Sequence, residues 1–346
     1  MYYYGNIPNM ETQTTLQTYT GFDWHNYNLS QTREKDIFIR LLNETCELIQ
    51  EKEIKTKGRK PMKMKDLVFS IVMKQYLNMS SRRVNSDLRL FRECGFIEDE
   101  IHFNTLLRNM ERTELRRVLK ELVEISALPM QNIEQDFAID ATGFSVSRYV
   151  TYFDFKHKKD RRQKTWRKCH AVCGVKTNII TSVDISEGYS HDSNYFESLV
   201  NNTARNFKIR EFSADKGYLS KKAYNMIEDL GGQAYIPFKS NSVKRSHWGG
   251  ASPNWKIMLN NFKNNNNEFM SHYHKRSNIE SCFSMIKRRF GNNLLCKKEI
   301  SQDNEILSKV LAHNLCILVQ EIFLRSIKIN LNFCASNYIA HSYVVK

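Results

Sequence analysis

The chain has 346 residues, long enough for one large domain or two ordinary ones, and 41% of them are hydrophobic, so it can form a folded core. Its 52 Lys and Arg exceed its 37 Asp and Glu and give a formal charge of +15, which indicates nucleic acid as partner, with a membrane surface as the rival interpretation. No run of about 18 apolar residues occurs and the first residues lack a basic, then apolar start, so we expect no membrane span and no signal peptide.

The N-terminal part of the chain has the pattern of a helical domain. Residues 1–30 are polar without a clear period, so we expect a loosely ordered arm there. Apolar residues then recur near the helical period over residues 31–56 and, after a basic linker, over residues 62–128. Pro129 stops the last of these helices. Residues 31–130 are therefore predicted to form a helical domain that binds DNA.

Two interpretations of this helical domain remain open. Ser80 and Ser81 are placed to cap a helix that carries Arg82 and Arg83, and a second short helical segment follows at residues 103–112. A short helix, a turn and a helix with basic residues fit a helix-turn-helix that reads a DNA groove. A helical bundle with solvated charges explains the same pattern about equally well.

From Asp136 onward the pattern changes to short strands. Strands are predicted over residues 137–142, 170–175, 179–185, 209–215 and 233–238. Helices are predicted over residues 192–206, 221–230, 273–290 and 303–328, the last of them amphipathic. This order is that of a ribonuclease-H-like fold, an α/β fold with a mixed five-stranded sheet and flanking helices. Its first three strands form an antiparallel meander, and its later strands run parallel through crossover helices.

The predicted catalytic domain covers residues 131–328. Within it, residues 239–272 look irregular and form a short insertion. Residues 329–346 are left as a C-terminal tail.

The eight cysteines contain no CxxC pair. Cys169, His170 and Cys173 come closest to a metal cluster, but they lie in a predicted strand and their spacing does not match the usual zinc patterns. We therefore expect structural thiols and a reducing cytoplasm.

Two aspartates end predicted strands that can lie side by side. Asp140 lies at the carboxyl end of the first strand and Asp215 at that of the fourth, where open sheets gather their ligands. Adjacent carboxylates repel each other, so a cation must lie between them or one stays protonated. Mg²⁺ or Mn²⁺, as a pair of ions, would resolve this and clamp the oxygens of a phosphoryl displacement. Asp136 and Asp184 are weaker alternatives, because Asp136 lies on the approach to the first strand and Asp184 lies on the third strand with no turn after it.

A helix with a mixed polar face supplies the third carboxylate. Tyr273, Arg276, Glu280 and Lys287 fall within roughly 60° of one another around a helix. Glu280 is predicted to bind metal, and Arg276 and Lys287 to hold phosphates. Tyr273 is predicted to bond a phosphate or stack on a base, and packing of its ring in the core is the alternative. A solvated face with surface salt bridges is the structural alternative for the others.

A basic segment and two tryptophans are further candidates for contact with DNA. Residues 152–167 are rich in Lys and Arg and are predicted to follow the DNA backbone, with a solvated charge run as the alternative. The DNA-contacting residues predicted there are Lys158, Lys159, Arg161 and Arg162. Trp248 and Trp255 either stack on an unpaired base or anchor their loop in the core.

In four motifs, which occur in the family's order, the chain resembles DDE-type insertion-sequence transposases. The helix from Tyr273 to Lys287 matches the family's Y-x2-R-x3-E-x6-K signature. The strand around Asp140, the turn from Asp215 to Tyr218 and the pair His191 and Asp192 resemble the other three motifs. Each motif alone is weak, but four in order are specific, and they span about residues 60–325.

The resemblance implies an enzyme that cleaves DNA at transposon ends and joins the freed 3′-hydroxyl to target DNA. It also implies a catalytic triad of Asp140, Asp215 and Glu280 with Mg²⁺ or Mn²⁺, and a homodimer on double-stranded DNA. Such a protein acts on the nucleoid in the cytoplasm and needs no membrane partner. Some relatives carry a large β-rich insertion before the glutamate helix, and residues 239–272 are too short for it, so a hairpin route is not implied. A nuclease of the same fold and a silent DNA-binding descendant are the alternatives.

Overall fold

A computed structural model of the chain describes residues 23–51, 62–146, 166–242 and 253–336. The first part is helical, as predicted, but its first helix begins at Trp24, where Asp23 accepts a hydrogen bond from the Asn26 amide at 3.0 Å. The helices are α1 (Trp24–Thr32), α2 (Glu34–Glu47), α3 (Met64–Tyr76), α4 (Val84–Glu93), α5 (Phe103–Asn109), α6 (Thr113–Ala127) and the 3₁₀ turn η1 (Leu128–Met130).

The second part contains the predicted five-stranded mixed sheet, in the order β3-β2-β1-β4-β5. Its strands are β1 (Asp136–Ser145), β2 (Trp166–Gly174), β3 (Ile180–Glu187), β4 (Glu211–Ala214) and β5 (Gln233–Tyr235). The pairs β1–β2 and β2–β3 are antiparallel, whereas β1–β4 and β4–β5 are parallel. This order confirms the ribonuclease-H-like fold.

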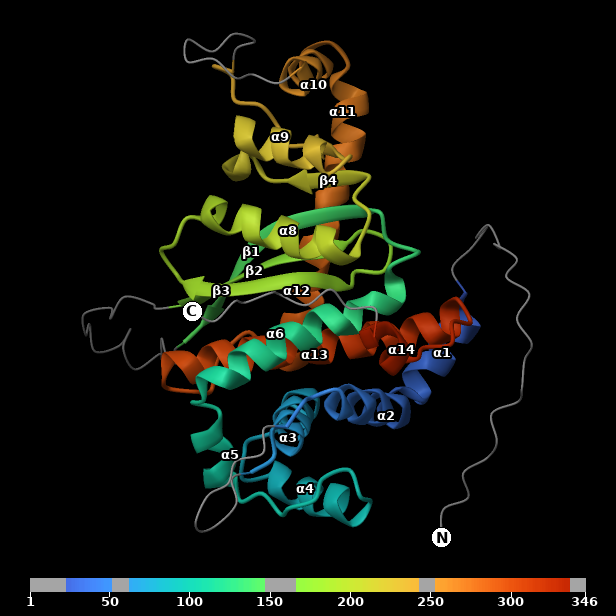
Figure 1. Ribbon diagram of the computed structural model, residues 1–346, viewed down its shortest axis with the longest axis vertical. Helices are drawn as coiled ribbons and strands as arrows, with labels where there is room; N and C mark the ends of the chain where they lie inside the picture. Colours follow the sequence, from blue (N-terminus) through green and yellow to red (C-terminus); the bar gives the residue numbers. More distant parts are fainter. Residues whose placement is uncertain (1–22, 52–61, 147–165, 243–252, 337–346) are drawn as a thin grey trace, which may run out of the picture.

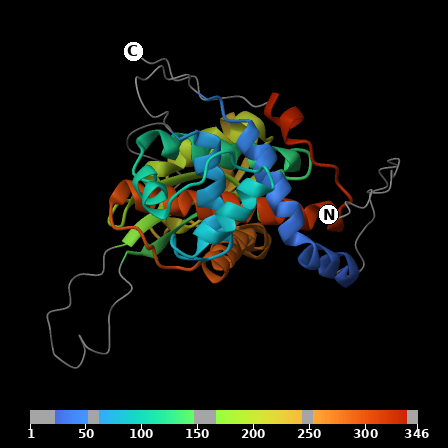
Figure 2. The same ribbon diagram turned by 90° about the horizontal axis from the view of Figure 1, so that it is seen from below.

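Helices flank the sheet and cover both of its faces. They are η2 (Asp192–Tyr195), α8 (Phe196–Asn206), η3 (Lys216–Tyr218), α9 (Lys221–Asp229), α10 (Pro253–Asn264), α11 (Asn266–Tyr273), η4 (His274–Arg276), α12 (Ser277–Phe290), α13 (Glu299–Leu324) and α14 (Leu331–Ser336). Helices α6 and α13 lie between the sheet and the N-terminal helices, and α9 to α11 lie at the opposite end of the molecule (Figure 1). Seen from below, the blue N-terminal helices cross α13 (Figure 2).

Strand β1 is longer than predicted, because Gly143 does not end it. Gly143 pairs with Lys168 in the antiparallel ladder with β2. A Cβ at this position would lie 3.2 Å from Trp166 Cδ1, so the glycine makes room for the indole ring of the neighbouring strand. Asp140 therefore lies in the middle of β1 and not at its end, and the strand that stops beside it is β4.

Residues 253–273 are helical, so the prediction of an irregular insertion over 239–272 was wrong for this stretch. Trp255 of α10 is buried and packs on Tyr224, at 5.4 Å between ring centroids, and on Phe238, at 4.9 Å. This aromatic cluster fixes α10 against α9. The asparagine-rich junction of α10 and α11 has no periodic apolar pattern, which is why the helices were missed.

Helix α13 is buried on nearly all sides and is not amphipathic as predicted, because α1, α2, α3 and α6 pack on it as well as the sheet. Asn314 joins these layers: its side chain bonds both the amide and the carbonyl of Ile180 in β3, at 2.9 and 2.8 Å, and the Val123 carbonyl of α6 at 3.2 Å. By length and composition α13 would also be able to cross a membrane, but 78% of its apolar stretch is buried inside the protein.

Candidate active site

The parallel pairing of β1 with β4 brings the two predicted aspartates together. Ile139 lies opposite Ala214, the last residue of β4, so Asp140 and Asp215 occupy the next position on each strand. Asp140 Oδ1 accepts a bond from the Ala141 amide at 2.8 Å. Asp215 is exposed and caps η3, where its Oδ2 accepts a bond from the Gly217 amide at 3.4 Å, so an Asx turn lies beside the aspartate pair.

Helix α12 packs on β1 and β2 and brings Glu280 to the same place. Arg276 Nη1 donates to Asp140 Oδ2 at 2.6 Å, and its Nη2 donates to Glu280 Oε1 one helical turn further on. One guanidinium thus bridges two of the three predicted catalytic carboxylates. The side chain of Glu280 remains 56% exposed, so a ligand can approach it from solvent.

The pKa of Asp140 is raised in this cluster of carboxylates. Burial raises the pKa of Asp140, the Ala141 amide and Arg276 oppose this, and the charges of Asp215 and Glu280 raise it further. The burial of Asp140 and the two neighbouring negative charges therefore outweigh the effect of the single arginine. A site of this kind gains from an additional cation.

Lys287 and Tyr273 complete the predicted set. Lys287 Nζ donates to Thr142 Oγ1 at 2.6 Å and lies 5.4 Å from the centre of the Phe144 ring, on the stretch of β1 that follows Asp140. Burial lowers its pKa. The Tyr273 ring packs partly against the core and has the Arg276 guanidinium 5.9 Å from its centre.

Tyr218 is a site residue whose role the sequence pattern did not bring out. Its side chain is 3% exposed and its hydroxyl has no hydrogen-bond partner among the described residues. Burial raises the pKa of Tyr218, and the charges of Asp192, Asp140 and Asp215 raise it further. The signal for it was its place directly after Gly217 and three residues after Asp215, at the end of the motif that follows the second aspartate.

The two alternative aspartates lie elsewhere and are neutralised by basic residues. Asp136 accepts bonds from Arg210 and Lys275 at the start of β1. Asp184 pairs with Arg116 at 3.3 Å and with Lys120 at 3.2 Å. Their contacts explain these residues without a catalytic role.

The remaining predicted DNA contacts are not part of this cluster. Arg82 and Arg83 are exposed beside α4, near the end of the molecule opposite α9 to α11, and they precede the helix, which begins at Val84. Ser80 Oγ accepts from the Arg83 amide at 3.4 Å. Trp255 is a core anchor. The residues that lie outside the described part of the chain are Lys158, Lys159, Arg161, Arg162 and Trp248.

The model of the transposase DDE domain family matches residues 132–315, which is more than half of the chain and contains all three carboxylates. The chain belongs to this transposase family. It is also similar to a probable transposase for insertion sequence element ISA1214 of Archaeoglobus fulgidus, with 23% identity over 255 residues that cover 74% of this chain and 75% of that protein. No solved structure matches the chain.

The donor set of this transposase suits a hard divalent cation, because three carboxylates offer oxygen ligands. Within the described ranges, no three His, Cys, Asp or Glu side chains already stand in a metal-holding cluster. The Arg276 guanidinium lies between Asp140 and Glu280 and supplies the positive charge there. The oxygen atoms of the three carboxylates suit a divalent cation, and Arg276 alone does not balance their negative charge.

Proposed function

We propose that this transposase binds the ends of its insertion sequence, cleaves the DNA there and joins the freed 3′-hydroxyl to target DNA. The observation that carries the proposal is the meeting of Asp140, Asp215 and Glu280 at the place where β4 stops beside β1. The bridging arginine supports it, since a guanidinium is the best side-chain partner for a phosphate.

The three carboxylates would hold Mg²⁺ or Mn²⁺, and two such ions supply the charge that stabilises the attacking and leaving oxygens of an in-line displacement. Arg276, which here donates to Asp140 and Glu280, would turn its N–H donors to a DNA phosphate once cations neutralise these carboxylates. Lys287, with its lowered pKa, remains a donor beside β1. The Tyr273 ring lies next to Arg276 and offers a face on which a base can stack.

The rest of the protein supports the handling of DNA. We propose that Arg82 and Arg83 contact DNA from the helical part, and that the basic residues Lys158, Lys159, Arg161 and Arg162 follow the backbone. Two copies of the chain, each with one active site, would hold the two ends of the element. The net charge of +15 suits work on nucleoid DNA in the cytoplasm.

The deciding experiment uses the full chain, the DNA that flanks its gene, a target plasmid, and Mg²⁺ or Mn²⁺ against EDTA. We expect metal-dependent cleavage at inverted repeats, followed by joined products. Cleavage without joining would make the protein a nuclease of the same fold. Binding without cleavage in either metal would make it a regulatory descendant of a transposase.

Salt dependence tests the proposed contacts of the helical part. Each phosphate contact by Lys or Arg displaces counterions, so the logarithm of the binding constant should fall steeply with that of the salt concentration. Replacing Arg82 or Arg83 with Ala should reduce this slope by about 1 each. Arg117→Ala is the control, because this arginine of α6 already faces Glu121 at 3.8 Å. If the slope is unchanged in Arg82→Ala and in Arg83→Ala, these two arginines are not part of the DNA interface.

A further inference from the structure

The helix that carries the transposase signature is broken, and the break is fixed to the sheet. Instead of one helix from Tyr273 to Phe290, α11 ends at Tyr273 and the 3₁₀ turn η4 precedes α12. Lys275 and Arg276 are consecutive residues of this turn, and their side chains reach different parts of β1.

Lys275 binds two carboxylates at the starts of neighbouring strands. Its Nζ donates to Asp136 Oδ2 at 2.9 Å and to Glu211 Oε2 at 2.8 Å. Asp136 begins β1 and Glu211 begins β4, and the two lie opposite each other in the parallel ladder. Arg276 meanwhile binds Asp140, so two consecutive residues of η4 hold β1 at two positions on the same face.

The end of α11, just before the turn, has further contacts with the sheet. His272 Nδ1 lies 2.8 Å from Glu211 Oε2, and the His272 carbonyl accepts a bond from Ser213 Oγ at 3.2 Å. The imidazole also stacks on Tyr235 of β5, with 4.5 Å between ring centroids and 7° between planes. The approach to the signature helix is thus attached to β1, β4 and β5 together.

Burial makes the lysine contact strong. The side chains of Asp136 and Glu211 are 5% and 13% exposed, and that of Lys275 is 28% exposed. Ion pairs in such places are screened much less than surface pairs, and loss of one partner leaves the others desolvated. The poorer hydrogen bonding of a 3₁₀ turn is therefore offset by the contacts of Lys275 with Asp136 and Glu211.

We propose that Lys275 is a positioning residue for strand cleavage. By binding Asp136 and Glu211, Lys275 fixes the position and rotation of α12 relative to the sheet. It thereby places Glu280 and Arg276 beside Asp140 and Asp215. This inference rests on the proposed function, and Lys275 itself contacts no reacting atom.

The test compares Lys275→Met with Arg210→Met in the full chain. Both variants remove one cation from Asp136, to which Arg210 donates at 2.8 and 2.6 Å, but among the described residues Arg210 makes no hydrogen bond to the signature helix. We expect Lys275→Met to cleave about 10- to 100-fold more slowly at saturating DNA, because small misplacements of catalytic groups have effects of this size. Arg210→Met should stay within about threefold of wild type, and both should bind DNA ends like wild type.

A second measurement does not depend on cleavage. Calorimetric titration with Mn²⁺, without DNA, should show weaker binding by Lys275→Met than by wild type or Arg210→Met, because Glu280 no longer faces its partner carboxylates. Glu211→Gln has nearly the shape of the native side chain and removes the charge of one of the two carboxylates that Lys275 contacts. The affinity of Glu211→Gln for Mn²⁺ should fall by a smaller factor in the same direction. This variant keeps the test decisive if Lys275→Met folds poorly.

The outcomes separate this inference from the proposed function. If wild type binds Mn²⁺ but cleaves no DNA, the proposed function fails, and the Mn²⁺ titrations of the variants still decide the role of Lys275. Equal losses in Lys275→Met and Arg210→Met would show that only neutralisation of Asp136 matters. Wild-type cleavage and wild-type Mn²⁺ binding by Lys275→Met and Glu211→Gln would overturn the inference.

Discussion

Replacing Glu280 with Gln is expected to reduce cleavage and joining by about 1,000-fold or more while the affinity for DNA ends stays within about threefold. The amide has the size of the carboxylate and can still accept a bond from Arg276, but it carries no negative charge for a divalent cation. Single-turnover cleavage of labelled ends measures the rate, and a gel-shift titration measures the affinity.

The control for this variant is Glu228→Gln, which makes the same chemical change at an exposed position of α9 and should leave both quantities unchanged. A loss of DNA binding equal to the loss of cleavage would mean that α12 is a docking surface. Full cleavage by Glu280→Gln would remove Glu280 from the catalytic set and leave the role of the signature helix to Arg276.

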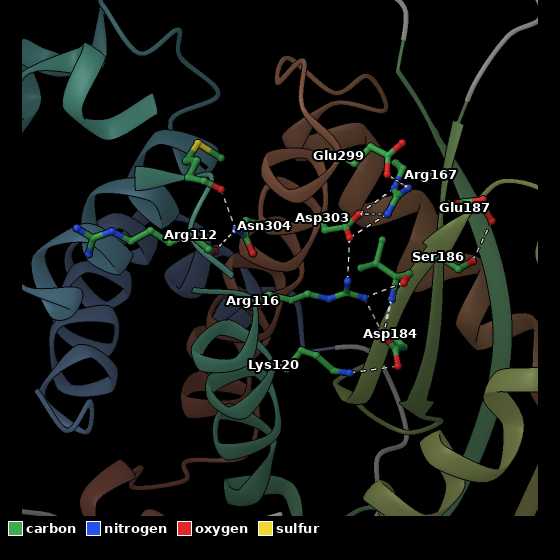
Figure 3. A network of polar contacts seen from close by, with 12 residues as sticks. Arg112, Arg116, Lys120, Arg167, Asp184, Ser186, Glu187, Glu299, Asp303 and Asn304 are labelled. Carbon is green, nitrogen blue, oxygen red and sulfur yellow. Dashed lines mark hydrogen bonds and ion pairs between the residues drawn. The ribbon is translucent and has the colours of Figure 1, made fainter. Parts of the chain in front are cut away.

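Replacing Asp303 with Leu is expected to lower the free energy of unfolding by about 3–5 kcal/mol. Asp303 of α13 is 2% exposed, accepts bonds from Arg167 Nε and Nη2 at 2.8 and 2.9 Å, and lies 3.1 Å from Arg116 Nη1 (Figure 3). Without it, Arg167 is a buried cation whose main partner is lost. Urea unfolding of the variant against wild type measures the change.

The double variant Asp303→Leu with Arg167→Met tests the cause. Burial raises the pKa of Asp303 although both arginines oppose this, so desolvation outweighs attraction in the network. Removing both ends should therefore recover most of the stability that the single variant loses. Glu111→Gln breaks an exposed pair with Lys298 and should change stability by less than about 1 kcal/mol. A double variant no more stable than the single one would contradict this account.

The same network shows how the helical part and the catalytic sheet are joined. Arg116 and Lys120 of α6 reach Asp184 on β3, and Arg167 of β2 reaches α13 at Asp303 (Figure 3). These contacts and those of Asn314 connect layers that the sequence divides into two domains. The helical part and the catalytic sheet are therefore held together at this junction.

The sequence alone determined the succession of the five strands along the chain and the identity of the candidate catalytic residues. A short pattern of apolar residues marks each strand separately, and the spacing from Tyr273 to Lys287 is local to one helical segment. Neither signal needs knowledge of distant partners. Asp140 and Asp215 could be paired in advance because parallel neighbours in an open sheet place their carboxyl ends together. The family comparison supports that reading of the whole segment.

The tertiary structure alone decided the features that depend on partners far along the chain. Strand β1 continues past Gly143 because β2 supplies a ladder and an indole to cover the glycine. Helix α13 is buried on nearly all sides because helices from the first part of the chain enclose it. At the turn η4, Lys275 binds carboxylates 64 and 139 positions away, and no local sequence pattern records the free energy of such contacts.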